Sequence, residues 1–193
     1  MRVAIFDIET SSLYANTGII LCAVIKEFGG KHIKVIRADE FDSWKKGKSD
    51  NRQVVTEIIN ELCGNRNNGQ DGYDIFVAHN GQYFDKTFLN TSCLLYGLRP
   101  SLRFEKFIDP VLIARRHMRL ARNSLASIID YFDLDEQKTH LQFKEWIKAS
   151  HDGNIKSMNI ITEHCVQDVK ALELAYKKIK SLVKGIDEYG SGR

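Results

Sequence analysis

The chain has 193 residues, of which 43% are hydrophobic and 27% are charged, values typical of a globular protein with one domain. The net charge of +3 does not mark the chain as a nucleic-acid binder, so any basic surface for such a partner must be local. The 4 cysteines lie far apart and no segment is apolar enough to span a membrane, which argues against a zinc site and favours reduced thiols. We expect a cytoplasmic protein without a signal peptide, with one domain over residues 1–186 and a flexible tail over residues 187–193.

The first predicted element is an apolar strand over residues 2–8 with two carboxylates near its end. Side chains alternate along a strand, so Asp7 and Glu9 point to the same face. The alternate positions are also apolar, which is typical of a central strand covered on both faces. Two like charges about 5 Å apart repel by roughly 3 kcal/mol at an effective dielectric of about 20. A divalent cation is therefore expected beside them.

The next elements indicate a mixed α/β sheet. Two strands over residues 19–28 and 31–37 are predicted to be joined by a two-residue hairpin turn at Gly29 and Gly30. The loop predicted over residues 64–72 is followed by alternating elements. Further strands are predicted over residues 74–79 and 102–109, and helices over residues 52–63, 83–96, 123–132, 141–149 and 155–184. This order predicts a five-stranded mixed sheet with helices on both faces.

Two later segments repeat the acidic pattern. Asp85 follows an apolar strand and starts a helix, where the helix dipole alone would favour an acid. Asp168 lies on the long last helix, with His164 one turn earlier on the same face. Read alone, this pair could be an ordinary surface pair on an amphipathic helix.

The combination of these acids predicts a metal-dependent hydrolase. Asp7, Glu9, Asp85 and Asp168 supply the oxygen ligands that Mg²⁺ or Mn²⁺ prefers. Two such ions about 3.5–4 Å apart can activate a water and stabilise the leaving oxygen of a phosphodiester. His164 is placed to take the proton of that water, because an unperturbed imidazole titrates near neutral pH.

Three segments, "FDIETSSL", "HNGQYFD" and "HCVQD", resemble the three motifs of the DEDD superfamily of proofreading-type 3′–5′ exonucleases. The resemblance extends from Phe6 to about Tyr176 and implies a ribonuclease H-like fold. It implies that the four carboxylates bind two divalent cations, Mg²⁺ or Mn²⁺, and that nucleoside 5′-monophosphates are released from a 3′ end.

The same resemblance implies several substrate contacts. Thr10 and Leu13 match positions that contact the terminal nucleotide in the family, although Leu13 could also be a core residue. Asn80 resembles the asparagine of the second motif in the proofreading domains of family B polymerases. Phe84, beside Asp85, is either a core residue or a stacking platform and completes the candidate contacts.

The third motif departs from the family pattern. The family places a tyrosine with three residues between it and the aspartate, or a histidine with four. Here His164 stands at the tyrosine spacing and Glu163 at the histidine position. We interpret His164 as the residue that orients or deprotonates the attacking water.

Other charged and aromatic residues have two readings each. Arg115, Arg119 and Arg122 would share a helical face that tracks phosphates or is merely solvated. Trp44, predicted in a loop over residues 44–48, could stack on a base. Asp109 before Pro110 is better read as a helix N-cap than as a fifth metal ligand. We interpret three further histidines as structural or exposed: His79, His140 and His151.

The expected substrate is a single-stranded or frayed 3′ end, with DNA favoured over RNA. The alternatives are a 3′–5′ exoribonuclease for short RNA, a ribonuclease H-like endonuclease and a non-catalytic nucleic-acid-binding module. A polymerase or another replication protein is a possible partner. The sequence leaves the oligomeric state open.

Overall fold

The computed structural model describes residues 1–46, 50–65, 69–99, 102, 106–135 and 141–183. Its centre is a five-stranded sheet in the order β3-β2-β1-β6-β7. Strands β1 (Val3–Thr10), β2 (Ile20–Glu27) and β3 (Ile33–Arg37) are antiparallel neighbours. Strands β6 (Ile75–Val77) and β7 (Phe107–Ile108) continue the sheet in parallel with β1. The predicted mixed sheet is confirmed.

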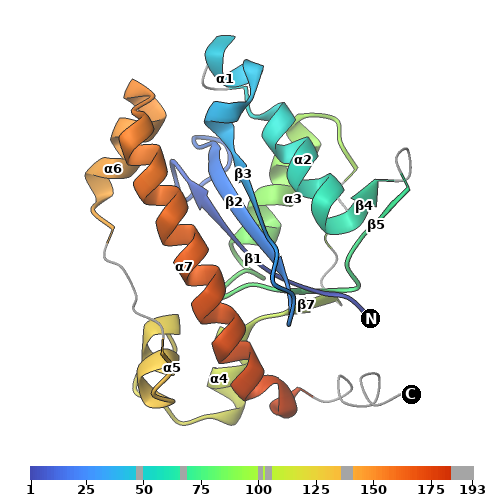
Figure 1. Ribbon diagram of the computed structural model, residues 1–193, viewed down its shortest axis with the longest axis vertical. Coiled ribbons are helices and arrows are strands. Elements are labelled where there is room, and N and C mark those ends of the chain that lie inside the picture. Colours follow the sequence, from blue (N-terminus) through green and yellow to red (C-terminus); the bar gives the residue numbers. More distant parts are fainter. Residues whose placement is uncertain (47–49, 66–68, 100–101, 103–105, 136–140, 184–193) are drawn as a thin grey trace.

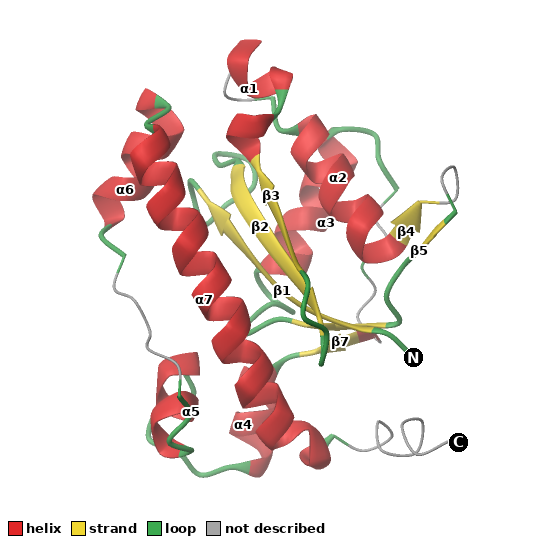
Figure 2. Ribbon diagram, viewed as in Figure 1, coloured by secondary structure: helices red, strands yellow, loops and turns green. Residues whose placement is uncertain are grey.

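Helices cover both faces of this sheet (Figures 1 and 2). The long helix α7 (Ile155–Ile179) crosses one face, while α2 (Arg52–Cys63) and α3 (Asp85–Leu95) pack on the other. The remaining described helices are α1 (Asp42–Lys46), α4 (Pro110–His117), α5 (Leu125–Tyr131) and α6 (Phe143–Ile147), with the 3₁₀ turns η1 (Ala38–Glu40) and η4 (Lys180–Leu182) and the π-helical turn η3 (Lys148–Asp152).

Periodicity in the sequence explains this layering. Strands β1 and β2 are apolar on both faces, and their hydrophobic side chains are almost fully buried. Helix α7 buries one stripe at helical spacing, including Ile161, Cys165, Val169 and Leu172. Because the central strands and the facing stripe of α7 are buried together, the position of α7 against β1 is firmly set.

Several predicted elements differ in detail. The tight turn after β2 closes with the Gly30 N–H donating to the Glu27 carbonyl, and its left-handed residue is Gly29 (φ 77°). The connection to β3 therefore takes five residues, 28–32, and the predicted two-residue turn at Gly29 and Gly30 is wrong. The longer connection follows from the register of the two strands, in which the last pair is Lys26 with Ile33.

The region predicted as a loop over residues 64–72 contains a small two-stranded sheet, β4 (Gly64–Asn65) and β5 (Gln70–Asp71). Gly64 (φ 82°) ends α2 in a conformation that favours glycine, and this lets the chain turn directly into β4. Of the strand predicted over residues 102–109, only β7 is found among the described residues, because 103–105 lie outside them.

The last helix of the described chain ends at Ile179 and is followed by η4. The predicted tail over residues 187–193 lies outside the described residues. Within the described part, none of the helices combines the length and apolarity that crossing a lipid bilayer requires.

Candidate active site

Strand β1 places the first two acids on the face of the sheet that α7 covers. Pairing with β6 ends at Ile5, whereas β1 continues to Thr10. Asp7 and Glu9 lie on this extension, on the face toward α7. The register between β1 and β2 shifts between Glu9 and Thr10, a local irregularity of the kind often found beside functional sites.

Asp85 supplies a hydrogen-bond acceptor to the part of β1 that extends beyond β6. Beyond the last β6 partner, the Ile8 N–H would lack a strand partner, and it donates instead to Asp85 Oδ1 over 3.0 Å. Asp85 is the first residue of α3 and only 2% exposed. The hydrogen bond therefore ties the second motif to the first across 77 positions of sequence.

The loop before Asp85 is held by Asp109. Asp109 caps α4 by accepting the Val111 N–H over 3.0 Å, which confirms the predicted N-cap. The same carboxylate accepts the N–H groups of Asn80 (2.9 Å) and Gln82 (3.2 Å). Asn80 takes a left-handed conformation (φ 60°), which asparagine tolerates better than most residues. Asp109 thus orients the loop that leads into Asp85.

Helix α7 supplies the third group of residues. His164 Nε2 lies 3.6 Å from Asp168 Oδ2 and 3.9 Å from Glu9 Oε1. The Cys165 thiol lies 3.4 Å from Asp7 Oδ2 and donates to it. Residues from the first and third motifs, separated by more than 150 positions, therefore meet at one place.

A cavity of about 460 Å³ opens at this place. All four predicted carboxylates and all four predicted substrate contacts line it. Its lining comprises Asp7, Ile8, Glu9, Thr10, Ser11, Ser12, Leu13, His79, Asn80, Phe84, Asp85, Phe143, Trp146 and Asp168.

The electrostatics of the cavity disfavour several ionised carboxylates at once. Burial raises the pKa of Asp7 well above its usual range, and the charges of Asp85, Glu9 and Asp168 raise it further. Burial also raises the pKa of Asp85 to about 7, although the hydrogen bond from the Ile8 N–H works in the opposite direction. Bound cations would reverse this preference, since they stabilise the ionised form of each acid.

The donor set fits hard divalent cations in its chemistry, because the four acids offer carboxylate oxygens and line one cavity. As these side chains are oriented, however, no three His, Cys, Asp or Glu residues of the described chain form a ready-made ion site.

The candidate substrate residues have distinct settings. Leu13 is 76% exposed, so its alternative reading as a core residue is wrong. The Thr10 hydroxyl donates to the Ser12 carbonyl over 2.7 Å and so shapes the loop after β1. Phe84 is half-buried against Phe88 and also lines the cavity. It therefore packs as a core residue on one side and is available as a stacking platform on the other.

Three other predictions need correction or fall outside the structure. Helix α4 ends at His117, so Arg119 and Arg122 lie beyond it and the predicted arginine stripe does not exist. Trp44 lies in α1 and is 9% exposed within the hydrophobic core, where it cannot stack on a base. His140 lies outside the described residues.

Two aromatic residues of the cavity were missed. Phe143 and Trp146 come from α6, which precedes the third motif and contains no recognised signature. The Trp146 Nε1–H donates to Glu9 Oε2 over 2.9 Å. In the sequence, the sign that these residues line a site is a pair of aromatic residues three positions apart in a short polar helix, and this sign is weak. His79 was also read as structural or exposed, yet it lines the cavity.

Comparison with known proteins agrees with this architecture. Residues 4–180 match the family model of the RNase H superfamily. This chain belongs to the RNase H superfamily. Membership indicates a nuclease, and the order of strands and helices around the cavity is that of a ribonuclease H-like fold. No curated protein matches the sequence.

Among solved structures, this RNase H superfamily member is similar to the family B DNA polymerase from the hyperthermophilic archaeon Pyrobaculum calidifontis. The TM-score is 0.61 at 16% sequence identity. The similarity covers 92% of this chain and 24% of the polymerase chain. At this identity the likeness shows a shared fold, and the chain spans about a quarter of that larger protein.

Proposed function

We propose that the protein is a 3′–5′ exonuclease that removes nucleoside 5′-monophosphates from the 3′ end of single-stranded nucleic acid. The observation that carries the proposal is the single cavity lined by Asp7, Glu9, Asp85 and Asp168. These acids come from three separate segments of the chain, and in a nuclease fold their convergence supports phosphodiester hydrolysis.

The four carboxylates would hold two divalent cations, Mg²⁺ or Mn²⁺, that activate a water and stabilise the leaving oxygen when bound. Asp85 would bind in its ionised form while still accepting the Ile8 N–H, so the loop and the strand stay together. The Cys165 thiol donates to Asp7 Oδ2 over 3.4 Å and gives this carboxylate a partner within the chain.

His164 is the proposed general base. Its Nε2 lies 3.9 Å from Glu9 Oε1 and 3.6 Å from Asp168 Oδ2, so the imidazole stands beside two of the proposed metal ligands. This role replaces that of the tyrosine or histidine at the family position.

The substrate contacts proposed are Thr10, Leu13, Asn80 and Phe84. Leu13 and Phe143 expose 76% and 73% of their surfaces and both line the cavity, which suits contact with an unstacked base. Because Asn80 is exposed beside the carboxylates, its amide can hydrogen-bond a nucleotide.

We favour DNA as the substrate because the structural neighbour is a DNA polymerase. A polymerase or another replication protein is the proposed partner, because the structural neighbour is a DNA polymerase. A cytoplasmic location belongs to the same proposal.

The test uses single strands of DNA and RNA labelled at either end, with Mg²⁺, Mn²⁺ or a chelator. Stepwise shortening from the 3′ end that the chelator abolishes is the expected result. Internal cuts would indicate an endonuclease instead, and binding without cleavage would indicate a non-catalytic module. Faster shortening of short RNA than of DNA would reassign the enzyme as an exoribonuclease.

A further inference from the structure

Trp146 contacts the candidate active site from outside the three motifs. Its indole Nε1–H donates a 2.9 Å hydrogen bond to Glu9 Oε2. The other oxygen of the same carboxylate, Oε1, lies 3.9 Å from His164 Nε2. Glu9 is therefore held from two sides, by a neutral donor on one oxygen and by the proposed base near the other.

Trp146 itself is fixed by the surrounding helices. Its neighbour Glu145 accepts a 2.6 Å hydrogen bond from the Ser157 hydroxyl of α7. The Ser150 hydroxyl donates to the Trp146 carbonyl over 2.8 Å, where η3 continues α6. A five-residue helix has little stability of its own, so these bonds to η3 and α7 hold the helix that carries the indole ring.

We propose that Trp146 is a positioning residue that keeps the Glu9 carboxylate beside the other acids of the cavity, where it can take part in binding a divalent cation; this inference rests on the proposed function. Indole N–H is a donor only, so its bond to Glu9 has one possible direction. Repulsion from Asp7 and Asp85 would otherwise drive the flexible Glu9 side chain away from the other acids. The N–H opposes that movement before any ion arrives.

Trp146→Phe is the variant that tests this role, because it keeps an aromatic ring and removes the N–H. Loss of a group that orients a metal ligand typically weakens metal affinity by about 10–100-fold. We expect Mn²⁺ binding to weaken by about tenfold in calorimetric titration of the metal-free protein. The melting temperature without metal should stay close to that of the wild type, which separates positioning from a general packing role.

Trp44→Phe is the matched control. Trp44 is the other of the chain's 2 tryptophans and lies in the hydrophobic core rather than in the cavity. Its replacement should leave the Mn²⁺ affinity unchanged, whatever it does to stability. Equal Mn²⁺ affinity for Trp146→Phe and the wild type would overturn the inference while leaving the proposed function intact.

The control variant provides a second, independent readout. With Trp44 replaced, Trp146 is the sole tryptophan, and paramagnetic Mn²⁺ bound nearby should quench its fluorescence with a saturable curve. Binding of Mn²⁺ without any quenching would place Trp146 away from the ion and overturn the inference. A wild-type protein that binds no Mn²⁺ at all would overturn the proposed function together with it.

Discussion

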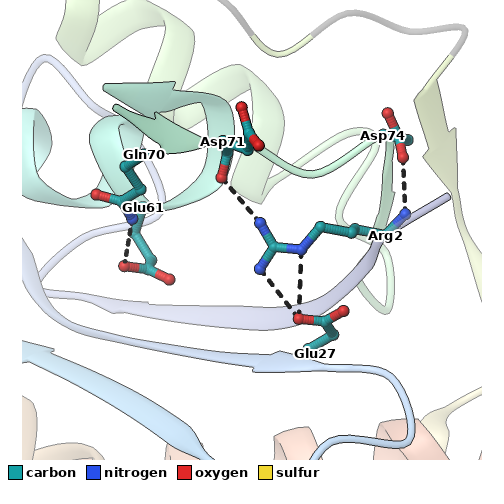
Figure 3. A network of polar contacts seen from close by, with 6 residues as sticks. All are labelled: Arg2, Glu27, Glu61, Gln70, Asp71 and Asp74. Carbon is teal, nitrogen blue, oxygen red and sulfur yellow. Dashed lines mark hydrogen bonds and ion pairs between the residues drawn. The ribbon is translucent and has the colours of Figure 1, made fainter. Parts of the chain in front are cut away.

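Acidic side chains near the two ends of strand β1 have different kinds of partner. At the start, the Arg2 guanidinium pairs with Glu27 at 3.0 Å and donates to the Asp71 carbonyl at 2.9 Å, while its backbone N–H donates to Asp74 at 2.7 Å (Figure 3). At the far end, the partners of Asp7 and Asp85 are the Cys165 thiol and the Ile8 N–H. At the first end the Glu27 carboxylate meets a cation of the chain, whereas at the second end Asp7 and Asp85 meet neutral donors.

We interpret this difference as that between a structural ion pair and the proposed functional site. The Arg2–Glu27 pair is half-exposed, and in it one carboxylate is matched by one cation of the chain itself. In the cavity, burial and the charges of neighbouring acids raise the pKa values of Asp7 and Asp85. Such an arrangement costs stability unless a bound cation compensates it, which is the expected trade-off at a catalytic site.

The largest expected effect follows from removing one acid of the cavity. Asp7→Asn should reduce nuclease activity by at least about 10³-fold, because it removes a carboxylate on which the two ions depend. The metal-free variant should melt at the same or a higher temperature than the wild type, because like-charge repulsion is relieved. Comparable activity of wild type and variant in a 3′-labelled assay would contradict the account.

Replacement of His164 comes next in size. His164→Ala should lower kcat by about 10²–10⁴-fold, the usual contribution of a general base. His164→Tyr, which restores the residue type of the family, should retain more activity than the alanine variant. A pH–rate profile checks the role, since the acidic limb should be lost in the alanine variant. An unchanged profile would exclude His164 as the base.

The free energy of unfolding should depend on pH because of the acids at the cavity end of β1. The pKa of Asp85 is raised from 3.8 to about 7, so the folded state binds more protons than the unfolded state between these values. The free energy of unfolding should therefore fall as pH rises from about 4 to about 7, by an amount on the order of a few kcal/mol. Urea titrations of metal-free protein across this range measure the slope.

Asp85→Asn is the control for that slope, because its amide oxygen can still accept the Ile8 N–H. The variant should lose much of the pH dependence, and the part due to Asp7 should remain, since its pKa is raised in the same direction. An equally steep slope in wild type and variant would show that Asp85 is not the source.

The smallest effect is expected at the start of β1. Arg2→Ala removes a half-exposed ion pair and the contact of the guanidinium with the Tyr73 ring at 4.4 Å. Each such interaction contributes at most about 1 kcal/mol at an exposed site, so the free energy of unfolding should fall by about 1–2 kcal/mol. Nuclease activity should not change. A large loss of activity would mean that the two ends are not independent.

The sequence was sufficient for those parts of the molecule that depend on local patterns. Helix α2 begins and ends at the predicted residues, because its apolar positions follow helical spacing and a glycine ends it. Asp109 was recognised as an N-cap because proline follows it. The motif acids were located because their residue types and order are specific, and the structure places them in one cavity.

The failures have a common physical cause, which is tertiary packing. Trp44 was predicted in a loop, yet the core encloses it, and a short helix offers too few positions to reveal a buried face. Trp146 was missed because its contact with Glu9 spans 137 positions and requires the packing of α6 on α7. The arginine stripe assumed a helix that ends at His117.

Metal stoichiometry tests the central claim most directly. Calorimetric titration of the metal-free protein with Mn²⁺ should give two bound ions for the wild type, and Asp168→Asn should lose at least one of them. Arg2→Ala should bind both ions as the wild type does. No binding to the wild type, or full binding to Asp168→Asn, would contradict the claim that these distant acids jointly hold the ions.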